Sequence, residues 1–143
     1  DNVFLEYWDN EKATIESFKD GWFCTGDVAV LDDGYYRIMG RSSIDIIKSG
    51  GYKLSALEIE GVLLTHPSVS EVAVIGVEDE TWGESVLAFI GLNDGAELKY
   101  DDLKKWCDGK MSSYKIPKDI KIIDALPRNA MGKVTKPDLK KLV

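Results

Sequence analysis

The second half of the chain alternates apolar stretches with polar breaks, and this pattern predicts a small sheet. Residues 69–77 and 86–92 are rich in β-branched and apolar side chains, a composition typical of β-strands. The turn-prone residues 78–84 join these two stretches. A shorter apolar stretch at 120–123 predicts a third strand.

Helix-start signals flank these strands. Ser55 and Glu58 match a capping box, in which each side chain satisfies a free backbone amide at the start of a helix. This spacing predicts a helix over 56–64. His66 stands before a proline at the end of this helix, a position that favours a helix-terminating role over that of a catalytic base.

Two further helices complete the predicted body. Apolar residues recur on one face over 101–111, which predicts a second helix. Thr135, with Asp138 three residues later and Pro137 in the first turn, predicts a short terminal helix. Helix, strand, strand, helix, strand and helix around one small sheet make an α+β fold.

The first part of the chain has a different pattern. Short apolar stretches at 28–31 and 35–39 are separated by Asp32-Asp33-Gly34, which predicts a β-hairpin. We see no internal repeat and no low-complexity tract.

Composition and charge exclude several classes of function. The net charge of −7, from 25 acidic and 18 basic residues, argues against binding that depends on neutralising nucleic-acid phosphates. Residues 110–143 nevertheless carry nine basic and three acidic side chains, so this end is basic and the rest acidic. The basic end is compatible with a polyphosphate ligand or with a solvated charged face.

Cysteine usage and hydropathy point to an intracellular protein without a membrane span. Cys24 and Cys107 are far apart, with neither metal-ligand spacing nor the density of a disulfide scaffold, which favours a reducing compartment. No apolar run approaches the roughly 20 residues of a spanning helix. With a single histidine and no cysteine cluster, we expect no dedicated metal site.

The common nucleotide-binding motifs do not fit. A phosphate loop needs glycine five residues before Gly-Lys and Ser or Thr after it, but Pro127 and Val134 stand there. The glycines near residue 50 lack the dinucleotide-binding spacing. Lys133 follows a glycine and precedes a predicted helix, so a long cation meets a permissive backbone there, although a loop lysine is usually only solvated.

Four separated segments, in order, resemble one family. They are GWFCTGD at 21–27, DGYY with GR at 33–41, KSGGYK with EIE at 48–60, and PRNAMGKV at 127–134. The chain therefore resembles the adenylate-forming superfamily of acyl-CoA synthetases, peptide-synthetase adenylation domains and beetle luciferases.

The resemblance implies a domain organisation. These enzymes are much longer, and the chain begins at Asp1 without a methionine, as a fragment would. Residues 1–40 resemble the tail of the large N-terminal ATP- and acyl-binding domain. Residues 41–45 resemble the hinge, and residues 46–143 the mobile C-terminal lid domain. The family's phosphate-contacting loop and acyl pocket would lie upstream, so we expect the 143 residues alone to be inactive.

The resemblance also implies a reaction and its residues. Such enzymes join a carboxylate to AMP from ATP and then pass the acyl group to the thiol of CoA. Lys133 matches the catalytic lysine that approaches when the lid closes and stabilises negative charge on the reacting oxygens. Asp27 matches the aspartate that binds the ribose hydroxyls, and Arg41 an arginine near ribose and phosphates. Lys53 stands where some relatives have a phosphate-binding arginine.

A second group of matched residues concerns CoA and the hinge. Ser49, Gly50 and Gly51 match the loop that lines the pantetheine tunnel, where glycine leaves the passage open, although a plain turn would also use glycine. The hinge residue stays open because the chain carries one extra residue there. Counting from Arg41 gives Ser43, whereas counting back from the glycines gives Ile44 and puts Asp45 on the aspartate that follows the hinge.

The motif set most resembles malonyl- and methylmalonyl-CoA synthetases, an acid–thiol ligase class, and by that resemblance alone suggests mitochondria. The implied ligands are ATP, CoA, a small carboxylate and Mg²⁺ held mainly by phosphates and the upstream domain, which is itself the expected partner. Two alternatives remain: an adenylation domain that loads a carrier protein, and a non-catalytic small-molecule-binding module of the same fold.

Overall fold

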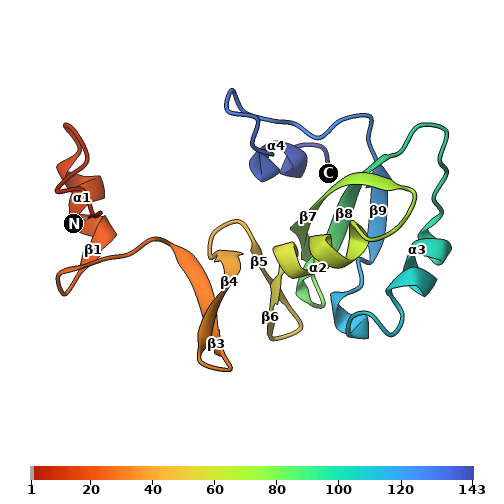
Figure 1. Cartoon of the computed structure of the whole chain (residues 1–143), viewed down its shortest axis with the longest axis horizontal. Helices are drawn as coiled ribbons and strands as arrows, with labels where there is room; N and C mark the ends of the chain where they lie inside the picture. Colours follow the sequence, from red (N-terminus) through yellow and green to blue (C-terminus); the bar gives the residue numbers. More distant parts are fainter. Residues whose placement is uncertain (1) are drawn as a thin grey trace.

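The computed structural model describes residues 2–143 and shows an elongated chain with a compact body at its C-terminal end (Figure 1). The first elements, α1 (Glu11–Ser17) and the two-residue strands β1 (Phe18–Lys19) and β2 (Trp22–Phe23), stand apart from the body. The hairpin of β3 (Asp27–Asp32) and β4 (Tyr35–Arg41) lies between them. We call residues 2–40 the tail and residues 46–143 the body.

The body is built on one mixed five-stranded sheet. Its strands are β5 (Ile46–Ser49), β6 (Tyr52–Ser55), β7 (Val69–Asp79), β8 (Gly83–Leu92) and β9 (Asp119–Ile122). The long β7–β8 hairpin is antiparallel, and β9 runs parallel to β8. The β5–β6 hairpin joins β8 on the edge that β9 also occupies, opposite β7, through the single pair Ser49 and Gly83.

Helices cover both faces of this sheet, so successive strand residues are buried in different layers. On one face, Val72, Val74 and Val86 pack with α2 (Ala56–Leu63) and α3 (Tyr100–Cys107). On the other face, Ala73, Ile75, Leu87 and Phe89 pack with Leu126 and with Leu139 of α4 (Lys136–Lys140). The two buried faces explain why both strands are apolar throughout instead of alternating with polar residues.

The predicted α+β fold and its six body elements are confirmed, with two differences. The polar link predicted at 78–84 is shorter, because Glu78 still pairs with Glu84 across the β7–β8 ladder. The region predicted as a glycine turn before α2 is a complete β5–β6 hairpin. This hairpin has no clear sequence signal, because its strands are only four residues long and carry charged side chains.

Helix ends differ from the predictions in detail. The helix expected over 101–111 ends at Cys107, because Asp108 is extended and Gly109 has φ +73°. Ser55 caps α2 by accepting the Glu58 N–H at 3.1 Å, but the Glu58 carboxylate pairs with Lys115 instead of completing a capping box. The predicted terminal helix is confirmed as α4, with Thr135 at its N-cap position, although the Thr135 hydroxyl donates to the Pro127 carbonyl and makes no side-chain cap bond.

The tail contains one element that the sequence reading missed and one that it found. The predicted hairpin is confirmed as β3–β4, with Asp33 and Gly34 both at positive φ in its turn. Helix α1 was missed, although Asn10 caps it through the Ala13 N–H at 3.0 Å. The helix has only seven residues and no buried side chain, so it lacks the periodic apolar stripe that a sequence reading detects.

Candidate functional site

Lys133 lies in a tight loop whose backbone is fixed by local hydrogen bonds. The Asn129 carboxamide oxygen accepts the N–H groups of Met131 and Lys133, both at 3.0 Å, and the Asn129 N–H donates to the Lys133 carbonyl at 2.9 Å. Gly132, at φ +79°, makes the turn possible. The Lys133 side chain is exposed and forms no ion pair within residues 2–143. The loop therefore presents an unpaired cation from an ordered backbone.

An ion pair between Glu71 of β7 and Arg128, which we call the clip, holds this loop on the body. Arg128 donates to the Gly132 carbonyl at 2.9 Å and pairs with Glu71 at 2.5 Å. The other Glu71 oxygen accepts the Leu126 N–H at 2.7 Å. This backbone bond, with the Arg128 charge, holds the pKa of the Glu71 carboxyl below its usual value despite partial burial. Glu71 and Arg128 were not singled out from the sequence because a surface Glu–Arg pair has no local motif.

Asp27 and Arg41 are brought together by the β3–β4 hairpin. They are directly paired across the two strands, and Arg41 Nε lies 3.7 Å from Asp27 Oδ1. The Thr25 hydroxyl accepts the Asp27 N–H at 3.1 Å and orients that residue. Both side chains remain partly exposed, so a carboxylate and a guanidinium are available together to a ligand with hydroxyl and phosphate groups.

The predicted CoA loop is the two-residue turn of the β5–β6 hairpin. Gly50 and Gly51 both have positive φ, +57° and +82°, as a type I′ turn requires. The Gly50 N–H donates to the Trp82 carbonyl at 2.9 Å. A Cβ at Gly50 would lie 2.8 Å from the Trp82 ring, whereas one at Gly51 would meet nothing within 4 Å. The glycine at 50 thus permits close packing, and the one at 51 leaves open space.

An aromatic pocket of about 190 Å³ lies beside this turn and was not anticipated from the sequence. The Tyr52 and Tyr114 rings stack there with centroids 4.7 Å apart. Lys118 lies over the Trp82 ring at 4.6 Å. These residues come from three separated segments of the chain, so no sequence pattern links them. The pocket offers flat rings and a cation to a ligand that reaches the Ser49–Gly51 turn.

Lys53, predicted near phosphate, pairs directly with Lys48 across the β5–β6 hairpin. Both side chains are exposed. Two like charges opposite each other destabilise a hairpin, and a bound anion would relieve that repulsion. Lys48 belongs to a matched motif, but the sequence alone gave no role to its side chain.

The three hinge candidates differ in their surroundings. Ser43 and Ile44 are exposed in a turn, whereas the Asp45 side chain is 14% exposed and paired with Lys136. The structure groups the predicted residues into three places: Asp27 with Arg41 on the β3–β4 hairpin, the Ser49–Gly51 turn with Lys53, and Lys133 on its own loop. The segment 41–45 connects the first place to the other two.

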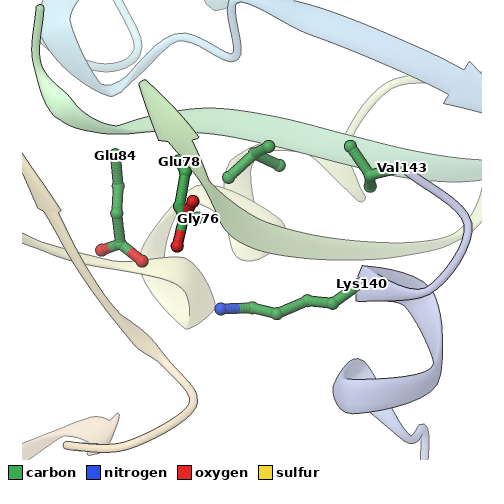
Figure 2. A pocket seen from close by; sticks show the side chains of 6 residues that line it. Gly76, Glu78, Glu84, Lys140 and Val143 are labelled. Atoms are coloured by element: carbon green, nitrogen blue, oxygen red, sulfur yellow. The ribbon is translucent and has the colours of Figure 1, made fainter. Parts of the chain in front are cut away.

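Another pocket, of about 350 Å³, is lined by none of the predicted site residues. Figure 2 shows its lining, with the Lys140 side chain extending toward the side where Glu78 and Glu84 lie. Glu84 already accepts the Lys48 N–H at 2.6 Å, which fixes strand β5 against β8. We assign no function to this pocket.

Other features bear on the remaining predictions. Within residues 2–143, no group of three or more His, Cys, Asp or Glu side chains could hold a metal ion. No helix in the same range is long and apolar enough to cross a membrane. The His66 ring accepts the Ser68 N–H through Nδ1 and packs edge-on against Trp106, a local role at the end of α2. Burial raises the pKa of the Cys107 thiol, which disfavours a reactive thiolate.

Comparison with known proteins defines the class to which this fold and these loops belong. The family model of the AMP-binding enzyme C-terminal domain matches residues 58–133, and the chain belongs to this family. The chain is 52% identical over 139 residues to the mitochondrial malonate–CoA ligase ACSF3 of Bos taurus, covering 96% of this chain and 24% of the relative. It is 43% identical to the 2-succinylbenzoate–CoA ligase of Geobacillus kaustophilus, covering 99% and 29%. The chain thus spans about a quarter of the length of the curated relatives it matches.

Solved structures of one relative, MatB from Rhodopseudomonas palustris, extend the comparison. The ATP-bound crystal structure superposes with a TM-score of 0.89 at 38% identity, over 99% of this chain and 28% of that one. The apo structure, at the same identity and the same shares, gives 0.73. Because the identity and the coverage are the same for both structures, the difference between the two TM-scores reflects a different arrangement of the matched parts.

Proposed function

We propose that this chain forms the mobile lid, with the adjoining edge of the ATP-binding domain, of a ligase that joins a carboxylic acid to CoA through an acyl-adenylate. The observation that carries the proposal is the Lys133 loop. An unpaired cation stands on an ordered backbone and on the same body as the glycine turn of the β5–β6 hairpin. One body can then bring either the cation or the turn to a substrate held elsewhere.

In the first step, a carboxylate oxygen attacks the α-phosphate of ATP and pyrophosphate leaves. Negative charge accumulates on the oxygens around the phosphorus, and a lysine that approaches in a site without water stabilises it. We assign this role to Lys133. Asp27 would accept hydrogen bonds from the ribose hydroxyls, and Arg41, 3.7 Å away, would bind close to the phosphates. Mg²⁺ would be held mainly by the phosphates and by residues upstream of this chain.

In the second step, the CoA thiol attacks the acyl carbon and AMP leaves. We propose that the Ser49–Gly51 turn lines the passage of the pantetheine arm, because Gly51 leaves open space where a side chain would stand. The stacked Tyr52 and Tyr114 rings and the Trp82–Lys118 pair beside this turn suit the nucleotide end of CoA. Lys53 and Lys48 add positive charge for phosphates near the same hairpin.

Between the steps, the body would rotate about residues 41–45, and we propose Ser43 and Ile44 as the pivot because they are exposed in a turn. The higher TM-score to ATP-bound MatB than to apo MatB supports an orientation suited to the first step. The exposed apolar side chains of residues 2–40 would be covered by the upstream domain, which is the partner we propose for the tail.

The names of the relatives favour malonate as the acid and, for the animal enzymes, a mitochondrial location; we include both in the proposal. The full-length enzyme should be assayed with malonate, methylmalonate, acetate, 2-succinylbenzoate and longer acids, following pyrophosphate release and CoA thioester formation. We expect both products with malonate at the highest kcat/KM. Pyrophosphate release without any thioester would contradict the CoA ligase assignment, and preference for another acid would overturn the substrate alone.

A further inference from the structure

A buried ionic cluster joins the segment after the Lys133 loop to the predicted hinge. Lys136 Nζ lies 2.6 Å from Asp45 Oδ1 and 2.8 Å from Glu60 Oε1. Lys136 is 8% exposed, whereas lysine is almost never buried unless it is paired. Desolvation offsets most of the attraction in such a cluster, so a gain in stability does not by itself explain its position.

Two of its three members are fixed to rigid parts of the body. Glu60 belongs to α2, and its Oε1 also accepts the Val74 N–H from β7 at 2.8 Å. Lys136 begins α4, three residues after Lys133. The ammonium that holds Asp45 is therefore attached to the sheet, to α2 and to the loop that carries the catalytic lysine.

The second oxygen of Asp45 reaches back across the hinge. Asp45 Oδ2 accepts the Arg41 N–H at 3.0 Å, and the Asp45 N–H donates to the Arg41 carbonyl at 2.8 Å. Gly40, at φ +117°, has no room for a side chain, because a Cβ there would collide with the Asp45 side chain. Because Lys136 holds Oδ1, Oδ2 is kept at the Arg41 amide.

A second bond crosses the hinge beside the first. The hydroxyl of the buried Ser55 donates to the Met39 carbonyl at 2.6 Å while it caps α2. The Ala56 N–H donates to the Asp45 carbonyl at 2.8 Å, so the start of α2 and Asp45 form one unit. The end of β4 is thus held against the body at two points, one of which depends on Lys136.

We propose that Lys136 and Asp45 are positioning residues that hold the hinge in the orientation of the adenylation step. Rotation of the body would break the bond from Asp45 to the Arg41 amide, while the Lys136–Asp45 pair would travel with the body and with Lys133. This inference deepens the proposed function and rests on it, because it assumes two orientations that serve two half-reactions. Loss of Lys136 frees Asp45 and lowers the population of the adenylation orientation.

The test compares two substitutions in the same cluster in the full-length enzyme. Lys136→Met removes the cation at similar length, whereas Glu60→Gln weakens the cluster but leaves Lys136 on Asp45 and keeps an amide oxygen for the Val74 N–H. Adenylation is measured by ATP–pyrophosphate exchange. The second half-reaction is measured as thioester formation from supplied acyl-adenylate. We expect the ratio of the adenylation rate to the thioester-formation rate to fall at least about tenfold in Lys136→Met and less than about twofold in Glu60→Gln.

The ratio separates positioning from folding, because a loss of folded enzyme lowers both rates alike. Lys136→Arg, which keeps the charge, should restore most of the ratio. An unchanged ratio in Lys136→Met would overturn the proposal.

Hydrogen exchange gives a readout that does not depend on activity. The peptide containing the Arg41 amide should exchange at least about tenfold faster in Lys136→Met than in wild type or Glu60→Gln, since its acceptor is no longer held. Unaltered exchange would also overturn the proposal. A wild-type enzyme without ATP–pyrophosphate exchange would sink the proposed function instead, and the exchange rate of the Arg41 amide would then decide the positioning role alone.

Discussion

The tail and the body treat apolar side chains in opposite ways. All buried apolar side chains of the described residues belong to the body, from Ile47 to Leu139. The tail instead exposes large ones: Leu5 is 92%, Trp8 93% and Trp22 80% exposed. Both regions contain apolar strands, so the hydrophobic content of a strand does not decide whether it is buried.

The difference lies in what each strand can pack against. The sheet of the body has helices on both faces and makes three layers. The tail has two separate two-stranded ribbons, which cannot cover a face of their own. Burial therefore depends on a second layer, which the body contains and which, in the proposed ligase, the upstream domain gives to the tail. The proposed chemistry is divided in the same way, with Asp27 on the tail and Lys133 on the body.

The largest expected effect is the loss of adenylation when Lys133, the proposed catalytic residue of the body, is replaced. In the full-length enzyme, Lys133→Ala should lower ATP–pyrophosphate exchange about 10³-fold, because one stabilising cation is lost from the transition state. Thioester formation from supplied acyl-adenylate should stay within a few-fold of wild type. Lys104→Ala, at an exposed lysine of α3, should change neither rate. Equal loss of both half-reactions would contradict the assigned role.

The division of burial is tested by one substitution made in both regions. In the 143-residue chain, Leu63→Ala should lower the free energy of unfolding by about 2–5 kcal/mol, because Leu63 is fully buried. Leu5→Ala should change it by less than about 0.5 kcal/mol. Urea denaturation measures both. If Leu5→Ala lowers the free energy of unfolding of the full-length protein by more than about 0.5 kcal/mol, the upstream domain covers the tail. If the free energy of unfolding stays unchanged there, the upstream domain does not cover Leu5.

A substitution in the turn of the β5–β6 hairpin should have a smaller effect, and this effect should fall mainly on thioester formation. Gly51→Leu should slow thioester formation at least about tenfold more than adenylation, because its side chain would narrow the CoA passage. Gly95→Leu is the matched control, since Gly95 also has positive φ and open space around it. Its backbone strain should lower both rates in the same proportion. A Gly51→Leu enzyme impaired mainly in pyrophosphate exchange would refute the tunnel assignment.

The clip that holds the Lys133 loop predicts the smallest effect, in the pH dependence of stability. The pKa of Glu71 is lowered from 4.5 by folding, so its contribution is complete above that value and is lost as the pH falls through the lower folded value. In Glu71→Gln, the unfolding free energy should be lower by about 1 kcal/mol at pH 7, and the difference should shrink as the pH falls below 4.5. Urea titrations between pH 3 and 7 measure it. A difference that grows in acid would contradict this sign.

How far the sequence led can be judged from particular elements. Strands β7 and β8 were predicted because they are long and apolar, and α2 because Ser55 fixes its start. The β5–β6 hairpin was missed because its stability comes from β8 and Glu84, which lie more than 30 residues away. Among the proposed site residues, those within motifs, such as Lys133 and Asp27, could be nominated from the sequence. Trp82, Tyr114 and Lys118 could not, because only folding brings them together beside the Ser49–Gly51 turn.

The sequence by itself determined the α+β class, the family resemblance and the loop that carries Lys133, because these depend on local spacing and on turn chemistry. The tertiary structure decided which charges meet. Arg128 is 57 residues from Glu71 and Lys136 is 91 residues from Asp45, and both pairs lie in contact. Such pairs have no local sequence pattern, since the energy of an ion pair depends on distance in space and on burial.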